Sequence, residues 1–438
     1  MATIVPIPAD RHFGGRADRS CAGTRPEAVN GESRGVYPRA MAFDVAYVRG
    51  LIPSLGDGWI HLDPQAGMQV PDSVATAVTT SFRHLAAAPG GVYPSARASA
   101  DVTDSARRAI ADLVGGDAAG VVLGPSRYSL LACLAEALSP HAFLRGDVVV
   151  TRQDDEPNIV PWVRAAERYA GRIRWAEVDV ESGALPAWQF GDLVTPETEV
   201  VAVTLASSTT GAITDISEIT PLVREAGALF VVDATNAAPY LSLDIHELGA
   251  DVLVVSAERW GGPRMSAMVF REPQVIDRLR LMSMDPAAKG PARLEPEPHQ
   301  GSMLAGLVAS VEHIAGLDED GIGKRRRRLV TSLDGVYEYL QRLTYYLVTT
   351  LTQLNHVNVV GTEENRVPLV SFTVDGVSAD KVVRRLADNG VCALADVPNR
   401  ALVRMGAPDF GGAVTVGLAP YSTPYEVDHL VRTLGSFA

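Results

Sequence analysis

The regular alternation of short apolar runs with amphipathic helical segments constrains the fold of this chain most strongly. Runs such as VVAVTL (Val200–Leu205) and ALFVVD (Ala228–Asp233) are apolar at almost every position, as in strands that are buried on both faces of a sheet. Amphipathic segments separate them, and this β-α-β-α order predicts an open α/β domain with a mostly parallel sheet and helices on both faces. The predicted strands are Val121–Leu123, Asp147–Thr151, Ile173–Val178, Val200–Leu205, Ala228–Asp233, Asp251–Ser256 and Ala267–Phe270. The predicted helices are Val74–Leu85, Thr103–Val114, Tyr128–Leu138, Ile159–Tyr169 and Ile216–Glu225.

The pattern changes towards both ends of the chain. Residues 1–40 are rich in Gly, Arg and Pro without periodicity, so we expect a disordered extension, with Met41 as a possible true start. From about residue 293 longer helices precede a few strands, which predicts a smaller α+β domain. We therefore expect a large domain at 63–292 and a small domain made of 41–62 and 293–438. Its predicted elements are helices Leu304–Ala315, Leu329–Leu354 and Thr423–Leu434, and strands near Leu369–Val374, Val391–Ala395 and Ala413–Leu418.

Charge and composition exclude several kinds of partner. The formal net charge is −13, so we expect no binding to nucleic acid or to an anionic membrane. The basic run Lys324–Arg328 is interpreted as a solvated helix face. No apolar run approaches the roughly 20 residues of a membrane span. The three cysteines show no metal-ligand spacing, so we predict no metal site of that kind and a reducing, cytoplasmic location.

Four polar segments follow predicted strands, where ligands of open α/β sheets bind. Each also has a purely structural interpretation. Ser126 can bind an anion at a helix N-terminus or simply cap the helix. The acidic residues after Arg152 can favour a helix start. Asp233 can cap the next element or face a ligand cation, and Arg259 can form an ion pair with Asp233 or Glu258. The segments are LGPSRYS around Gly124, RQDDEPNIVPW at 152–162, VVDATNAAPY at 231–240 and DVLVVSAERWGGP at 251–263.

Together these segments resemble the class V aminotransferase family, in particular its cysteine desulfurase branch. DDEPNIVPW is similar to the family's EHHANIVPW-like segment, and residues 231–263 are similar to its VDGAQ…SGHK..GP signature in order and spacing. LDPQAGMQVP, RLEPEPHQGSMLAGLVASVE and YSTPYEVDHLV extend the match to both ends of the globular region. The resemblance implies a fold-type I pyridoxal 5'-phosphate (PLP) protein that forms a homodimer with its sites at the subunit interface.

The resemblance also implies a role for individual residues. Asp233 matches the aspartate that pairs with the pyridinium nitrogen and keeps the PLP ring an electron sink. Ser126 and Ser256 match phosphate-binding positions, and Ser208 matches the residue at the ring hydroxyl. Four more residues match cofactor-contacting positions or segments: Asp155 at the ring-stacking histidine, Asn158 in the same segment, Asn236 at a glutamine, and Glu258 at the histidine of SGHK.

The departures from the family pattern concern the chemistry itself. Arg259 stands where the family has the Schiff-base lysine, and a guanidinium stays protonated and cannot attack the PLP aldehyde near neutral pH. The chain's three lysines are Lys289, Lys324 and Lys381, and none is an obvious substitute. We therefore predict that PLP binds weakly or not at all. Further departures are Glu297-Pro298 at the family's phosphate-reaching Gly-Thr, Thr415 at its substrate-binding arginine, and Cys392 several residues before its nucleophile loop.

Three functions remain open from the sequence. The first is a degenerate PLP-fold or binding protein, which could hold a small amino-acid-like ligand in the old pocket. The second is an active aminotransferase, C–S lyase or desulfurase-type enzyme that uses non-covalent PLP or Lys289. The third is unrelated chemistry, including metal binding, at the acidic residues Asp154, Asp155, Glu156, Asp233 and Glu258.

Overall fold

The structure, a computed structural model, describes residues 43–437 except 86, 139–142, 145, 319–320 and 396–398. Residues 42–438 form one compact unit. The predicted extension at 1–40 and the possible start at Met41 lie outside the described residues. The division into domains at 63–292 and at 41–62 with 293–438 stays a prediction.

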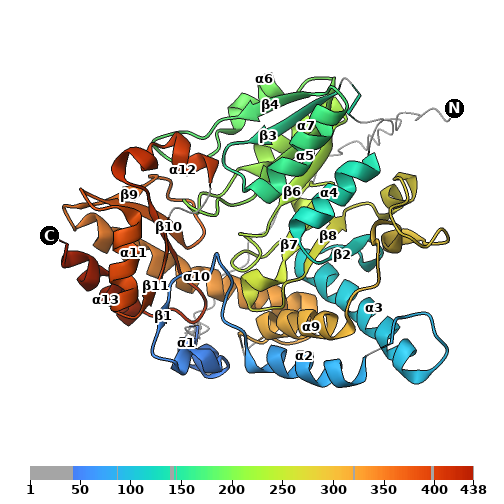
Figure 1. Ribbon diagram of the computed structural model, residues 1–438, viewed down its shortest axis with the longest axis horizontal. Coiled ribbons are helices and arrows are strands. Elements are labelled where there is room, and N and C mark those ends of the chain that lie inside the picture. The colour runs from blue at the N-terminus through green and yellow to red at the C-terminus, as the bar shows by residue number, and fades with distance from the viewer. Residues whose placement is uncertain are drawn as a thin grey trace, which may run out of the picture. The chain divides into compact units, whose positions relative to one another are not determined.

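A seven-stranded sheet forms the centre of this unit, with the strand order β2-β8-β7-β6-β5-β3-β4 (Figure 1). The five strands from β4 to β7 in this order run parallel, whereas β8 is antiparallel to both β7 and β2. This mostly parallel sheet, covered by helices, confirms the predicted α/β fold. Its strands are β2 Val121–Gly124, β3 Asp147–Thr151, β4 Arg172–Ala176, β5 Thr198–Thr204, β6 Leu229–Asp233, β7 Val252–Ser256 and β8 Ser266–Phe270.

The alternating side chains of each strand enter two different hydrophobic cores. In β5, Val200 and Ala202 pack with helices α4 and α5, whereas Val201 and Val203 pack in the core that contains α3, α7 and α9. Because successive side chains of a strand point to opposite faces, a continuous apolar run fills both cores at once. Figure 1 shows α4 and α5 side by side. The helices are α3 Pro94–Val114, α4 Arg127–Leu138, α5 Glu156–Arg168, α7 Ile216–Ala226 and α9 Gly301–Ala315.

A second, antiparallel sheet has the order β12-β13-β10-β9, and a short parallel pair joins β1 to β11. The strands are β1 Ile60–His61, β9 Val357–Val360, β10 Leu369–Val374, β11 Val391–Cys392, β12 Leu394–Ala395 and β13 Val414–Gly417. The remaining helices are α1 Val45–Gly50, α2 Asp72–His84, α6 Phe190–Leu193, α8 Ile245–Leu248, α10 Arg325–Thr352, α11 Ala379–Asp388, α12 Arg400–Arg404 and α13 Pro424–Gly435. None of the helices that the structure describes has both the length and the apolar character to cross a bilayer.

Two predicted elements differ from the observed ones. Helix α3 begins at Pro94 rather than Thr103, because a proline at the first helical position has its backbone angle already set for the helix. The residues that follow Pro94 are mostly small and polar, so the apolar pattern did not indicate a helix before Thr103. The predicted strand Val391–Ala395 divides into β11 and β12, which pair with β1 and β13 respectively.

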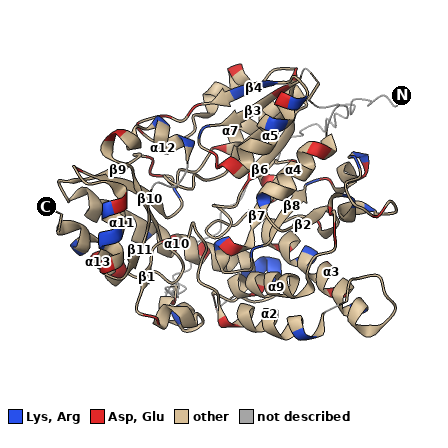
Figure 2. Cartoon of the chain, in the orientation of Figure 1, with Lys and Arg blue, Asp and Glu red and all other residues tan. Residues whose placement is uncertain are grey.

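The basic run at the start of α10 is only partly a solvated face, because Lys324 and Arg327 are exposed whereas the other three arginines are half-buried. Arg325 bonds Asp112 and Glu312, Arg326 bonds Asp244, and their side chains are 18% and 28% exposed. Cations in the first turn of a helix face the positive end of its dipole, so carboxylates from neighbouring elements compensate them. Figure 2 shows acidic and basic positions interspersed along the chain.

Candidate site at the carboxyl ends of the strands

The sheet brings the predicted site segments together because its parallel strands end at one edge. Arg127 begins α4 after β2, Asp155 follows β3, Ser208 follows β5, and Asp233 ends β6. Arg259 lies in a short 3-10 helix, Ala257–Trp260, after β7. This edge is therefore the candidate site.

Arg127 occupies the middle of the site. Its Nη1 donates to Asp233 Oδ2 at 2.7 Å and its Nη2 donates to Asp155 Oδ2 at 2.7 Å. Burial by itself lowers the pKa of Arg127, but the charges of Asp233 and Asp155 outweigh it and raise that pKa above its usual value. The second oxygen of Asp233 accepts a hydrogen bond from the backbone of Thr235 at 2.9 Å, so both oxygens of this carboxylate are engaged.

Asp155 is held as a carboxylate by several donors. Besides Arg127, its Oδ1 accepts hydrogen bonds from Ser208 Oγ and from Asn399 Nδ2. Burial raises the pKa of Asp155, but Arg127 and Ser208 outweigh burial and lower the pKa to about 2. Asp155 precedes the first turn of α5, yet its side chain makes no capping hydrogen bond. Its negative charge nevertheless lies at the N-terminal end of α5, where an acidic residue favours the helix start.

The neighbouring Asp154 experiences the opposite environment. It is 1% exposed, and its carboxyl group accepts hydrogen bonds from Thr151 Oγ1 at 2.7 Å and Asn158 Nδ2 at 3.1 Å. Burial away from any cation raises its pKa well above the usual value. Glu156 forms an ion pair with Arg400 at 2.6 Å. These contacts account for the acidic residues after β3 without a metal.

Arg259 forms no direct ion pair with any of the residues that the structure describes, although the charges of Asp155, Glu258 and Asp233 act on it. Its Nε and Nη1 are buried without a hydrogen-bond partner, and burial together with the charge of Arg127 lowers its pKa. The predicted ion pair with Asp233 or Glu258 is not formed, because Arg127 takes Asp233. Beside Arg259 lies a cavity of about 10 Å³, which is room for about one water molecule.

The other predicted site residues make local structural contacts. Ser126 Oγ accepts a hydrogen bond from the backbone of Ser129 at 3.1 Å, so it caps α4. Ser256 Oγ lies 2.7 Å from Ser266 Oγ across strands β7 and β8. Asn236 Nδ2 donates to the backbone oxygen of Ala206, and its Oδ1 has no partner. Glu258 is partly exposed, and its backbone oxygen accepts from Met68.

Sequence reasoning missed two residues of this site, Arg127 and Asn399. Arg127 lies in the LGPSRYS turn next to the predicted phosphate-binding serine. A charged residue at the start of an otherwise apolar helix was the available signal. Asn399 lies in ADVPNRA, more than a hundred residues beyond the strand ends it reaches, and only the tertiary fold brings it to Asp155 and Ser208.

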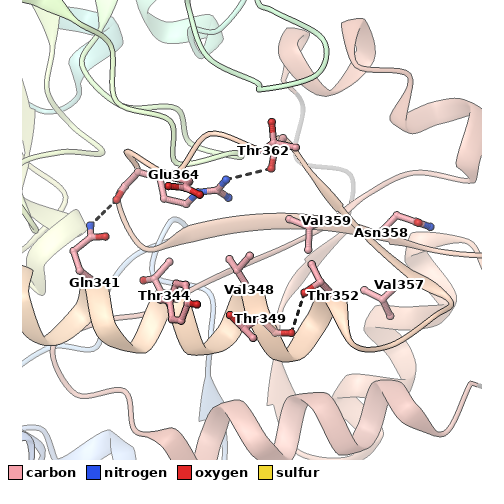
Figure 3. Close-up of a pocket in the computed structure, with 13 residues that line it drawn as sticks. Gln341, Thr344, Val348, Thr349, Thr352, Val357, Asn358, Val359, Thr362 and Glu364 are labelled. Atoms are coloured by element: carbon pink, nitrogen blue, oxygen red, sulfur yellow. Dashed lines mark hydrogen bonds between the residues drawn. The ribbon is translucent and has the colours of Figure 1, made fainter.

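Two larger cavities lie outside the Arg127 cluster. One of about 450 Å³ is lined by the turn at Gly124, by Ser129 and by the exposed Glu297-Pro298. The other, of about 650 Å³, lies between α10 and β9, where Thr344 and Val348 face Val359 (Figure 3). Neither cavity includes Asp155, Asp233 or Arg259 in its lining.

These side chains do not fit PLP as a covalently held cofactor. A Schiff base needs a neutral amine, yet Lys289, Lys324 and Lys381 are all exposed, whereas the side chains of Asp155 and Asp233 in this site are only 12% and 1% exposed. The pyridinium nitrogen needs a free carboxylate, yet Asp233 already binds Arg127. The remaining space beside Arg259 is far smaller than a pyridine ring.

Comparison with known proteins agrees with this fold. A family model described as "Aminotransferase class-V" matches residues 60–282. "Uncharacterized protein MT3887" of Mycobacterium tuberculosis is 54% identical over 396 residues, covering 90% of this chain and 100% of that protein. "Probable cysteine desulfurase" of Streptomyces coelicolor is 24% identical, covering 86% and 92%. The apo structure of a cysteine desulfurase from Thermococcus onnurineus superimposes with a TM-score of 0.80 at 22% identity, covering 90% and 97%. The chain therefore belongs to the class V aminotransferase family.

Proposed function

We propose that this chain is a degenerate PLP-fold protein, which keeps the class V fold but does not form the PLP internal aldimine. The observation that carries the proposal is the position of Arg127. Its guanidinium bonds both Asp233 and Asp155, the carboxylates that the family resemblance assigns to the cofactor ring. The protein thus supplies its own cation where the pyridinium would be, and acts as a scaffold or binding protein.

The surroundings of Arg259 support the same proposal. A guanidinium replaces the amine, and the adjacent cavity of about 10 Å³ has no room for a cofactor. The free Nε and Nη1 groups of Arg259 could bind the carboxylate of a small amino-acid-like ligand, but only if the side chains around them moved apart. Lys289 is exposed, and this position does not support a catalytic role for it. A homodimer in the cytoplasm remains our expectation.

PLP retention tests the proposal directly. Purified protein is mixed with PLP, desalted and examined for aldimine absorbance, then treated with borohydride and mapped by peptide mass spectrometry. We expect no retained absorbance and no modified lysine, because no amine lies in the site. A stoichiometric PLP adduct on Lys289, Lys324 or Lys381 would refute the proposal.

Restoring a lysine at position 259 tests whether Arg127 as well as Arg259 prevents PLP binding. We expect Arg259→Lys alone to retain no PLP, because Arg127 still holds Asp233. The double variant Arg127→Ser/Arg259→Lys is expected to retain more PLP than the single variant. Arg264→Lys, which adds a lysine at an exposed position, is the matched control. A yellow Arg259→Lys protein, or a double variant that circular dichroism shows to be folded and that retains no more PLP than the single variant, would show that Arg127 is not what excludes the cofactor.

A further inference from the structure

Three side chains suited to metal binding converge where β1 meets β11, and none of them belongs to the Arg127 cluster. The strands are parallel, and His61 pairs with Cys392 in their register. Asp63 follows His61 by two residues. One potential ligand atom from each of His61, Asp63 and Cys392 lies within 4.8 Å of the other two. His61 and Asp63 lie far from Cys392 in the sequence, so no local spacing of these residues indicates a metal site.

The imidazole of His61 is the strongest sign of a ligand. Its side chain is 11% exposed, and its Nε2 is buried without a hydrogen-bond partner. A carboxylate oxygen, Asp57 Oδ2, lies 3.5 Å from Nε2. A buried nitrogen left without a partner costs free energy, and a metal ion at this position would satisfy it.

The other ring nitrogen of His61 lies beside a side-chain amide. Nδ1 is 3.1 Å from Nε2 of Gln69, which donates to it in this orientation of the amide, and the backbone nitrogen of Gln69 donates to the hydroxyl of Tyr421. The oxygen and nitrogen of such an amide exchange places by a half-turn of the group. With Oε1 towards the ring, Gln69 accepts a hydrogen bond from Nδ1 and leaves the Nε2 lone pair free. Outer partners of this kind orient metal-binding histidines.

We propose that His61, Asp63 and Cys392 bind a divalent zinc-type ion, with Asp57 as the fourth ligand. A nitrogen, a thiolate and carboxylate oxygens form a ligand set typical of Zn²⁺. Ca²⁺ and Mg²⁺ prefer oxygen ligands alone. Asp57 Oδ1 accepts a hydrogen bond from the backbone of Trp59 at 2.8 Å, and its Oδ2 lies on the side of His61 Nε2, 3.5 Å away, so Oδ2 is the oxygen that would bind the ion. The ion would link β1 to β11 and thereby stabilise the pairing of these two short strands, which lie far apart in the sequence.

Cobalt binding to the full chain tests the site. Co²⁺ takes the same geometry as Zn²⁺, and a cobalt–thiolate bond gives a charge-transfer absorption in the near ultraviolet. Metal-free protein titrated with Co²⁺ is expected to develop this band up to one ion per chain, and Zn²⁺ is expected to abolish it by displacement. No such band in the wild-type protein would overturn the proposal.

Two substitutions and a control identify the ligands. We expect Cys392→Ser to lose the charge-transfer band, and His61→Ala to bind Co²⁺ at least about tenfold more weakly. Cys133→Ser is the control, because Cys133 belongs to the α4 core, where its Sγ donates to the backbone of Leu294. Circular dichroism verifies that each variant is folded. A band that persists in Cys392→Ser, or that disappears in Cys133→Ser, would place the metal elsewhere.

Discussion

At the scale of single residues, the site is decided by which charged groups meet. Asp154 and Asp155 are adjacent in sequence, yet burial raises the pKa of Asp154, whereas Arg127 and Ser208 offset the burial of Asp155 and lower its pKa. The two arginines also differ in pKa: the pKa of Arg127 is raised because it forms ion pairs with Asp155 and Asp233, whereas the pKa of Arg259, which forms no ion pair, is lowered by burial. A buried charge without a partner is costly, so Arg127 is the residue on which the cluster depends.

Replacing Arg127 by methionine should therefore destabilise the protein strongly. Arg127→Met leaves Asp155 and the 1% exposed Asp233 without their cation, and breaking a buried pair in this way costs about 3–5 kcal/mol. Urea unfolding at neutral pH measures the change in the free energy of unfolding. The pKa of Asp155 is lowered from 3.8 to about 2, so its ionised carboxylate stabilises the fold above pH 3.8 and this stabilisation disappears as the pH falls towards 2. The difference in unfolding free energy between the wild type and Arg127→Met should therefore become smaller on acidification.

The matched control for this prediction is Arg168→Met. Arg168 also forms an ion pair from a helix, with Glu136, but its side chain is 65% exposed. Solvent-exposed pairs contribute about 0–1 kcal/mol, so this variant should unfold nearly like the wild type. Equal losses for the two variants would mean that burial does not determine the importance of Arg127.

At the scale of elements, one buried glutamate joins three parts of the chain. Glu295 lies after the 3-10 helix Gly290–Leu294. It accepts two hydrogen bonds at 2.8 Å from Arg107 of α3 and one at 2.8 Å from the backbone of Leu123 in β2. Burial raises the pKa of Glu295, but His299 and Arg107 outweigh it and lower the pKa to about 2. The segment that leads from the large sheet to α9 is thereby fixed to the sheet edge.

Glu295→Gln should remove this electrostatic contribution. The fall of the pKa from 4.5 to about 2 corresponds to about 3 kcal/mol, which is present above the ordinary pKa and is lost as the pH falls through 2. We expect a loss of that size in urea unfolding at neutral pH, and a smaller loss below pH 4.5. Glu297→Gln, at an exposed residue two positions later, should change stability little. A pH-independent difference would contradict the electrostatic explanation.

At the scale of the whole molecule, the family resemblance predicts an assembly of two chains. The exposed Glu297-Pro298 stands where the resemblance expects a residue that reaches the partner's phosphate site, and it lines a cavity of about 450 Å³ with the turn at Gly124. Light scattering coupled to size exclusion should give twice the chain mass of 46.6 kDa. A single-chain mass that persists as the protein concentration rises would rule out a stable dimer.

The sequence by itself determined the seven strands of the central sheet, the approximate positions of the helices between them, and the missing amine at Arg259. These properties follow from local periodicity and from the chemistry of one residue type, so they need no knowledge of distant neighbours. Only the tertiary structure decided that Arg127 rather than Arg259 pairs with Asp233, that Asn399 reaches Asp155, and that His61 meets Cys392. Ion pairs and strand pairs act over a few ångströms between segments far apart in the chain, and sequence spacing does not encode those distances.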